Sequence, residues 1–141
     1  MEMIRNFILT AIFAILFFAG CATNFATTQS GLPDNSGRTI FYGLYRNDLR
    51  FRAIAVNETD GYRVVITNDL GAKLQDMKVS KSSGADYYFI ASLMPKNTIE
   101  EFEVFFQEYF CADSKNDIKN VNGRTYYYDN AGNAVLWIKE I

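Results

Sequence analysis

The sequence predicts an α+β domain in which a curved antiparallel β-meander packs one face against a single main amphipathic helix. Short β-favouring segments, separated by turn residues, follow one another from Thr39 to Ala91. An apolar stripe with three- and four-residue spacing comes next, between Ile99 and Phe110. Two more β-favouring segments close the chain, which gives about seven strands around one helix.

Five strands are expected before the helix, and the short turns between them favour antiparallel pairing of neighbours. Asp60-Gly61 is a strong hairpin signal between two of these segments. In the fourth segment, Leu74 and Met77 break the alternation of apolar and polar positions, which predicts a β-bulge. The expected strands are Thr39–Tyr45, Leu49–Val56, Tyr62–Thr67, Ala72–Ser80 and Tyr87–Ala91.

The helix is expected to begin at Ile99, after the lead-in Pro95-Lys96-Asn97-Thr98, and to end near Ala112. Thr98 and Glu101 are three residues apart and fit a capping box, in which the two side chains accept hydrogen bonds from free backbone N–H groups. The apolar stripe of the helix is wide and heavily aromatic. It comprises Ile99, Phe102, Phe105, Phe106, Tyr109 and Phe110.

Two strands are expected after the helix, Arg124–Tyr128 and Ala134–Ile141, joined by a hairpin loop. Asp129-Asn130 in this loop and Asn68-Asp69 in an earlier turn offer oxygen ligands for a metal ion. Turn residues of these types usually bind backbone amides instead, so hairpin chemistry accounts for both pairs. No metal site is predicted.

Residues 1–20 have the features of a secretory signal peptide. A weakly basic start precedes an apolar run from Phe7 to Ala19, which is shorter than the roughly 20 residues that span a bilayer. Small residues then surround the expected cleavage site, at Ala19, Gly20 and Ala22. The alternative is an uncleaved membrane anchor.

Phe18-Ala19-Gly20-Cys21 resembles the lipobox of bacterial lipoproteins, in which leucine is the usual first residue. The resemblance implies that Cys21 carries palmitate or related acyl chains and is the first residue of the mature protein. The next residue is Ala22 and not aspartate, which by analogy with enteric bacteria implies the periplasmic face of the outer membrane. Residues 21–38 are expected to form a flexible tether with a reach of roughly 20 Å. Residues 39–141 are expected to form one domain.

The composition argues against several classes of function. The sequence has no histidine, which excludes Ser-His-Asp and Cys-His catalysis and His-ligated zinc. Its net charge of −2 gives no basic excess for nucleic acid, and no polybasic segment is present for acidic lipid. Phosphate-binding loops and nucleophile elbows do not occur. We therefore expect a non-enzymatic protein without cofactors.

Two features allow more than one interpretation. Cys111 is the one cysteine besides Cys21, so it is either a buried inert thiol or a link to another chain. Arg50, Arg52 and Arg63 are expected on one outer face of neighbouring strands. They either meet an anionic partner, such as lipopolysaccharide, a cell-wall polymer or an acidic protein, or they form a solvated face.

The aromatic stripe of the helix also has two interpretations. It either fills an aromatic core, or it lines a cleft under the curved sheet that holds an acyl chain or an apolar segment of a partner. In the second case, the ligand-binding residues are Phe102, Phe105, Phe106 and Tyr109.

A lipobox and a tether are followed by a meander, with Asn68-Asp69-Leu70-Gly71 in a hairpin, and then by a helix. This order is similar to the LolA/LolB-type lipoprotein-carrier fold, over roughly Thr39 to Ile141. The resemblance is one of architecture, and it implies an unclosed barrel with an apolar cavity for acyl chains. The leading hypothesis is a membrane-anchored lipoprotein that binds a hydrophobic ligand or assists envelope assembly. The alternative is a tethered interaction module, either an accessory subunit or an inhibitor of an envelope protein. A carrier requires a cavity between helix and sheet, whereas an interaction module requires a filled core and an exposed apolar patch.

Overall fold

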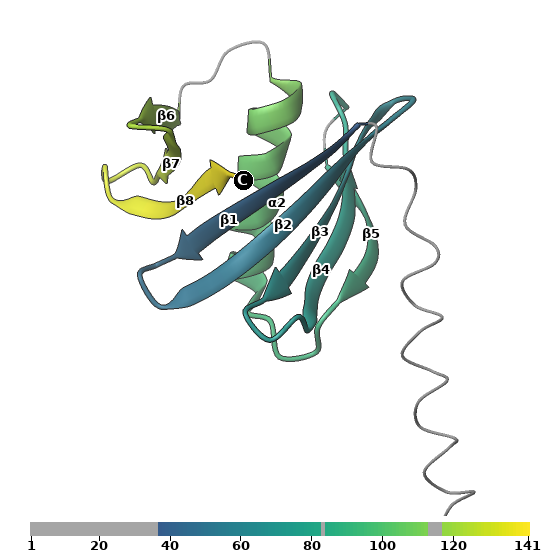
Figure 1. Ribbon diagram of the computed structural model, residues 1–141, viewed down its shortest axis with the longest axis horizontal. Helices are drawn as coiled ribbons and strands as arrows, with labels where there is room; N and C mark the ends of the chain where they lie inside the picture. The colour runs from purple at the N-terminus through teal and green to yellow at the C-terminus, as the bar shows by residue number, and fades with distance from the viewer. Residues whose placement is uncertain (1–36, 83, 113–116) are drawn as a thin grey trace, which may run out of the picture. The chain divides into compact units, whose positions relative to one another are not determined.

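The computed structural model describes residues 37–82, 84–112 and 117–141 (Figure 1). The predicted signal peptide, Cys21 and the tether up to residue 36 lie outside the described residues. The described part of Gly37–Ile141 is one compact unit with an eight-stranded antiparallel sheet and one helix. The predicted α+β class is confirmed, with one strand more than expected.

The strands form one open sheet in the order β5-β4-β3-β2-β1-β8-β7-β6. The first five strands are the expected meander, and β8 pairs antiparallel with β1, which joins the last three strands to it. Helix α2 lies behind the meander in Figure 1 and covers one face of the sheet. The elements are β1 (Arg38–Tyr45), β2 (Leu49–Glu58), β3 (Gly61–Asn68), β4 (Lys73–Val79), β5 (Ala85–Ile90), α2 (Lys96–Cys111), β6 (Ile118–Val121), β7 (Arg124–Tyr128) and β8 (Ala134–Glu140).

Alternation along the strands determines which side chains meet the helix. In β2, Phe51, Ala53 and Ala55 are buried while Arg50 and Arg52 are exposed, as the sequence predicted. The helix contributes its aromatic stripe to the same interior. The largest fully buried apolar side chains are Phe41, Phe51, Ile66, Met77, Phe102, Phe105, Phe106, Leu136 and Ile138.

The predicted bulge in β4 is confirmed. The pairing with β3 changes register at Leu74, which has no partner between Ile66 and Thr67. The pairing with β5 changes register between Asp76 and Met77, with Tyr88 as the extra residue of β5. Asp76 consequently points to the face away from the helix, where it meets Arg63, while Met77 lies in the core.

The predicted capping box is wrong. Helix α2 begins at Lys96, and its N-cap Pro95 makes no side-chain capping bond. Thr98 lies with Oγ1 3.1 Å from the hydroxyl of Tyr45 instead, and Glu101 accepts a hydrogen bond of 2.8 Å from that hydroxyl. Both side chains therefore hold the helix to β1, a long-range role that replaces the expected local one.

Strand β6 was not expected from the sequence. It has four residues and no run of alternating apolar positions, which explains why the pattern of hydrophobicity did not reveal it. The turn to β7 is made by Asn122 and Gly123, whose φ angles of 52° and 78° are typical of a type I′ hairpin. Asn-Gly was therefore the sequence signal for the missing strand.

Gly43 makes room for Phe51 to pack across β1. A Cβ at this position would lie 2.3 Å from the ring of Phe51 and 2.7 Å from the carbonyl oxygen of Trp137. Gly43→Ala is expected to lower the free energy of unfolding by about 1–3 kcal/mol, because the carbonyl belongs to the paired β8 strand and cannot move aside. Urea unfolding measures the loss, and an unchanged midpoint would contradict this packing.

Candidate functional site

The helix stripe that the sequence proposed as a ligand site is part of a filled aromatic core. Phe102, Phe105 and Phe106 have no exposed surface, and Tyr109 is partly buried. The ring of Phe102 packs edge to face on Phe51, with 5.0 Å between the ring centroids. Three of the four predicted ligand-binding residues therefore present no surface to a ligand in this conformation.

Hollows of modest size occur at the surface of the described residues. One of about 240 Å³ includes Tyr109 and Ile118 in its lining. Another of about 340 Å³ lies between the β2–β3 turn and the end of α2, next to Phe110 and Cys111. Small-molecule sites enclose most of the ligand, whereas both hollows are open to solvent, so neither is the enclosed cavity that an acyl chain requires.

Cys111 ends the helix as a partly buried free thiol. Burial raises its pKa, and the positive charge of Lys81 acts in the opposite direction with a smaller effect. A raised pKa keeps the thiol protonated at neutral pH, which makes it a poor nucleophile. This environment agrees with the interpretation of Cys111 as an inert thiol.

The predicted hairpin chemistry of the polar turns is confirmed. Asn68 Oδ1 accepts hydrogen bonds from the backbone N–H groups of Leu70 and Ala72, at 3.0 and 2.9 Å. Asp129 Oδ1 binds two backbone N–H groups in the last hairpin in the same way. Within the part of the chain that the structure describes, no three His, Cys, Asp or Glu side chains gather as metal ligands.

The sheet ends in two edges of different character. At one edge, β5 carries Tyr87, Tyr88, Phe89 and Ile90 in succession, and each of these side chains is between 39% and 55% exposed. At the other edge, β6 is only four residues long. Short edge strands are protected against further pairing, whereas a longer apolar edge can accept another strand. Strand β5 is therefore the candidate interaction site.

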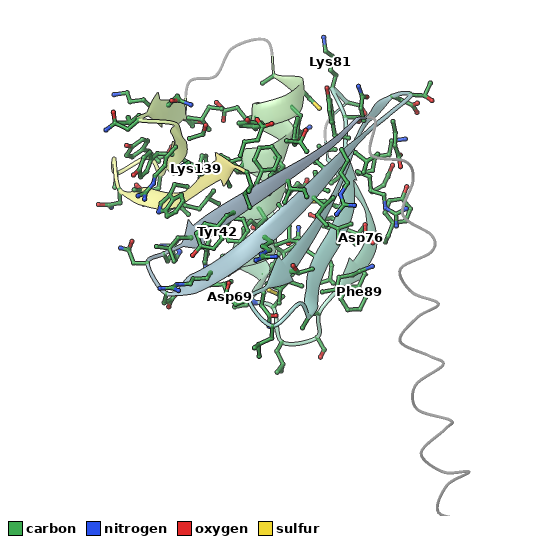
Figure 2. All side chains as sticks on the ribbon, in the orientation of Figure 1. Tyr42, Asp69, Asp76, Lys81, Phe89 and Lys139 are labelled. Carbon is green, nitrogen blue, oxygen red and sulfur yellow. The ribbon has the colours of Figure 1, made fainter. Side chains whose placement is uncertain are left out.

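The outer side of β5 rests on an ion cluster, defined here as Asp76 with Arg63 and Lys73. The Asp76 carboxylate is 2% exposed and accepts two hydrogen bonds from Arg63, at 3.0 and 3.1 Å, and one from Lys73 at 3.0 Å. The Arg63 guanidinium lies 4.4 Å from the ring centroid of Tyr88, and the Lys73 ammonium 5.8 Å from that of Phe89. Figure 2 shows Asp76 and Phe89 on these neighbouring strands. The ion cluster thus supports two aromatic side chains of the edge.

The three arginines that the sequence suggested for an anionic partner have different surroundings. Arg63 is engaged by Asp76 in the ion cluster. Arg50 and Arg52 are exposed on β2, and none of the ion pairs found among the described residues involves either of them.

The helix-facing side of β5 is acidic. The Tyr87 hydroxyl donates a hydrogen bond to Glu103, and the exposed Glu100 lies one turn earlier on α2. Burial raises the pKa of Tyr87, and the hydrogen bond and charge of Glu103 raise it further. Lys96 is 3.7 Å from Glu100, but its side chain is 90% exposed, so water screens this pair strongly. The edge therefore has an acidic rim on one side, formed by Glu100 and Glu103.

The ion cluster makes a testable contribution to stability. Burial alone raises the pKa of Asp76, but the hydrogen bonds and charges of Arg63 and Lys73 outweigh it, so the pKa in the folded protein is lowered. A lowered pKa contributes stability above the pKa of the unfolded chain, and this stability is lost as the pH falls through the folded-state value. Asp76→Asn should therefore destabilise by about 1–3 kcal/mol at neutral pH.

This stability difference should shrink in acid, because the wild-type carboxylate is then protonated as well. Urea unfolding of both proteins between pH 7 and pH 2 measures it. A difference that stays constant over this range would contradict the lowered pKa of Asp76.

The residues of β5 contain a signal for an exposed apolar edge that a search for alternating positions does not detect. Tyr87-Tyr88-Phe89-Ile90 is a run of large apolar residues without alternation, so both faces of the strand are apolar although one helix covers only one face of the sheet.

Comparisons with protein-family models, with curated proteins and with solved structures found no match. Among the described residues, no helix has the length and apolar character to cross a bilayer.

Proposed function

We propose that this chain is a lipid-anchored, non-enzymatic interaction protein of the bacterial envelope. Cys21 holds it at the periplasmic face of the outer membrane, and β5 docks an extended segment of a partner protein. The observation that supports this proposal best is the contrast between the closed aromatic core and the exposed apolar edge. Carriage of an acyl chain, the other function expected from the sequence, would require α2 to leave the sheet.

The form of the edge favours a partner in extended conformation. An edge strand offers unpaired backbone N–H and C=O groups, and an added strand forms main-chain hydrogen bonds with them. Side chains of the added strand alternate between the two sides of the sheet. On the outer side they would meet Tyr88 and Phe89, and on the helix side they would meet the acidic rim.

The charges around β5 favour a basic partner over a second copy of this chain. Antiparallel pairing of two β5 strands about a two-fold axis keeps both helices on the same face of the joined sheet. It would bring Glu100 and Glu103 of the two copies together, and like charges at close range are unfavourable. A partner segment with lysine or arginine on its helix-facing side and apolar residues on its outer side complements the edge on both sides.

A heptapeptide of alternating lysine and valine is a suitable probe for this edge. We expect it to shift the NMR resonances of the backbone amides of Ala85–Ile90 and to protect these amides from hydrogen exchange. The measurement uses the mature lipoprotein in detergent micelles. Two control peptides isolate the causes, one with glutamate in place of lysine, and one with N-methyl groups on every backbone nitrogen. Both controls are expected to bind more weakly, the first by charge repulsion and the second by loss of main-chain hydrogen bonds.

Variants of the protein complete the test. Glu100→Gln/Glu103→Gln should weaken binding of the lysine peptide, while Glu140→Gln, an exposed acid at the end of β8, should not. Equal binding of the lysine and glutamate peptides, or shifts outside β5, would overturn the proposed docking. A stable dimer in sedimentation would replace the basic partner with a second copy.

A further inference from the structure

The sheet face away from the helix carries two rows of residues that the strand register brings together. The first row runs Arg50, Leu44, Trp137, Tyr126 and Lys119, across β2, β1, β8, β7 and β6. The second runs Arg52, Tyr42 and Lys139, across β2, β1 and β8. In both rows, cations flank aromatic rings. Figure 2 shows Tyr42 and Lys139 on these neighbouring strands.

Contacts within this surface, here called the basic face, keep its aromatic rings together. The Arg124 guanidinium lies 4.2 Å from the ring centroid of Trp137. Tyr42 packs edge to face on Trp137, with 5.9 Å between the centroids. Both rings are partly exposed, and the cations at the row ends are exposed. The face thus presents partly exposed amphipathic rings with charged margins.

The charge of the basic face is uncompensated in the described part of the chain. None of the residues in its two rows is acidic, and none of the ion pairs found among the described residues involves their cations. Towards β4 the same side of the sheet is neutralised, since Asp76 holds Arg63 and Lys73, and Glu58 pairs with Lys78 at 3.3 Å. The fold therefore concentrates positive charge over β2, β1 and β8, although the whole chain has a net charge of −2.

We infer that the basic face lies on the anionic phospholipid surface to which the chain is anchored. The choice of a membrane rests on the proposed lipid anchor at Cys21. Tryptophan and tyrosine prefer the interface between headgroups and acyl chains, and lysine and arginine near anionic lipid contribute about 1 kcal/mol each.

The length of the chain between the anchor and the domain permits this contact. Cys21 precedes Arg38, the first residue of β1, by 17 residues. Even a fully extended chain of about 3.3–3.6 Å per residue therefore keeps the domain near the bilayer. Strand β1 runs through both rows of the basic face. Binding of the face to the membrane leaves β5, four strands away in the sheet, free for a partner.

Trp137 is the single tryptophan of the chain and lies in the basic face, so its fluorescence reports the contact directly. Mature lipoprotein is reconstituted in vesicles of phosphatidylcholine, with and without phosphatidylglycerol. Since the acyl groups insert into both kinds of vesicle, any difference belongs to the face. We expect a blue shift and loss of acrylamide quenching only with phosphatidylglycerol, both reversed in 1 M salt, where the Debye length falls to about 3 Å.

Charge variants locate the effect. Arg50→Gln/Arg52→Gln should abolish the response of Trp137 to phosphatidylglycerol. Lys119→Gln/Lys139→Gln, at the other margin of the basic face, should have the same effect. Lys81→Gln/Lys96→Gln removes the same charge away from the face, from the turn after β4 and from α2, and should respond like the wild type. Circular dichroism confirms that each variant is folded.

Three outcomes would overturn the inference. Equal quenching in the two kinds of vesicle would show that anionic lipid does not attract the face. A full response in both arginine and lysine variants would assign the contact to another surface. A response of Trp137 to soluble polygalacturonate but not to phosphatidylglycerol would assign the face to an acidic glycan. Protein that fails to float with either vesicle would instead contradict the lipid anchor, which separates the two proposals.

Discussion

Phe102→Ala is expected to destabilise the domain by about 3–5 kcal/mol, the range for truncating a buried phenylalanine. Phe102 has no exposed surface and contacts the rings of Tyr45 and Phe51, at centroid distances of 5.3 and 5.0 Å. Removal of its ring leaves a cavity under the sheet that β1 and β2 cannot close without losing their pairing. Since small domains have about 5–15 kcal/mol of stability in total, the loss should be visible in any unfolding assay.

Val104→Ala is the matched control, because Val104 lies on the same helix and is 45% exposed. It should change the free energy of unfolding by less than about 0.5 kcal/mol. Urea unfolding of the three proteins gives the comparison. If Phe102→Ala lowers the free energy of unfolding as little as Val104→Ala does, the helix does not pack on the sheet as described, and the interior has room for a ligand.

Cys21→Ala is expected to abolish labelling by radioactive palmitate and to leave uncleaved precursor. The lipobox resemblance implies that the thiol of Cys21 accepts the lipid and that cleavage requires this modification. Each buried CH₂ contributes about 0.8 kcal/mol to membrane affinity, so the loss of all acyl chains removes the main force that holds the mature domain at the bilayer.

Cys111→Ala provides the control for Cys21, because it removes the other cysteine of the chain. The thiol of Cys111 is partly buried at the end of α2, so this variant should be labelled and processed normally. Palmitate labelling that survives in Cys21→Ala, or is lost in Cys111→Ala, would contradict the lipoprotein assignment.

Local patterns predicted most of the secondary structure correctly. The strand alternation in β2 and the bulge in β4 follow from side-chain periodicity alone, and the structure confirms both. The capping box failed because Thr98 and Glu101 bind Tyr45, which is distant in sequence. A local motif competes with every tertiary partner that the fold brings near, and sequence spacing does not reveal that competition.

The surfaces proposed to act could not be derived from local patterns. Strand β5 was recognised as an aromatic strand, but its place at the sheet edge depends on the pairing of β1 with β8, which leaves the meander open at β5. The basic face likewise combines Arg50, Trp137 and Lys119 from three parts of the chain. No polybasic segment was found because these residues meet only through strand register.

The two proposed surfaces give the domain a division of roles. The basic face over β2, β1 and β8 would lie on the anionic membrane, and the acidic rim beside β5 would remain available to a basic partner. The two surfaces have opposite charge, so each disfavours the ligand of the other. The proposed function also requires that the core between the sheet and α2 stays closed to acyl chains.

Comparison of native and denaturing mass spectra of the mature lipoprotein, incubated with palmitate, tests the closed core most directly. The denaturing spectrum gives the polypeptide with its covalent acyl groups, and the native spectrum adds any molecule held in the interior. We predict the same mass in both spectra, because Phe102, Phe105 and Phe106 fill the space under the sheet. A native mass increased by one palmitate would contradict the account. If the variant Ala55→Leu, which adds a larger side chain to the interior, then showed the same mass in both spectra, the result would support a carrier.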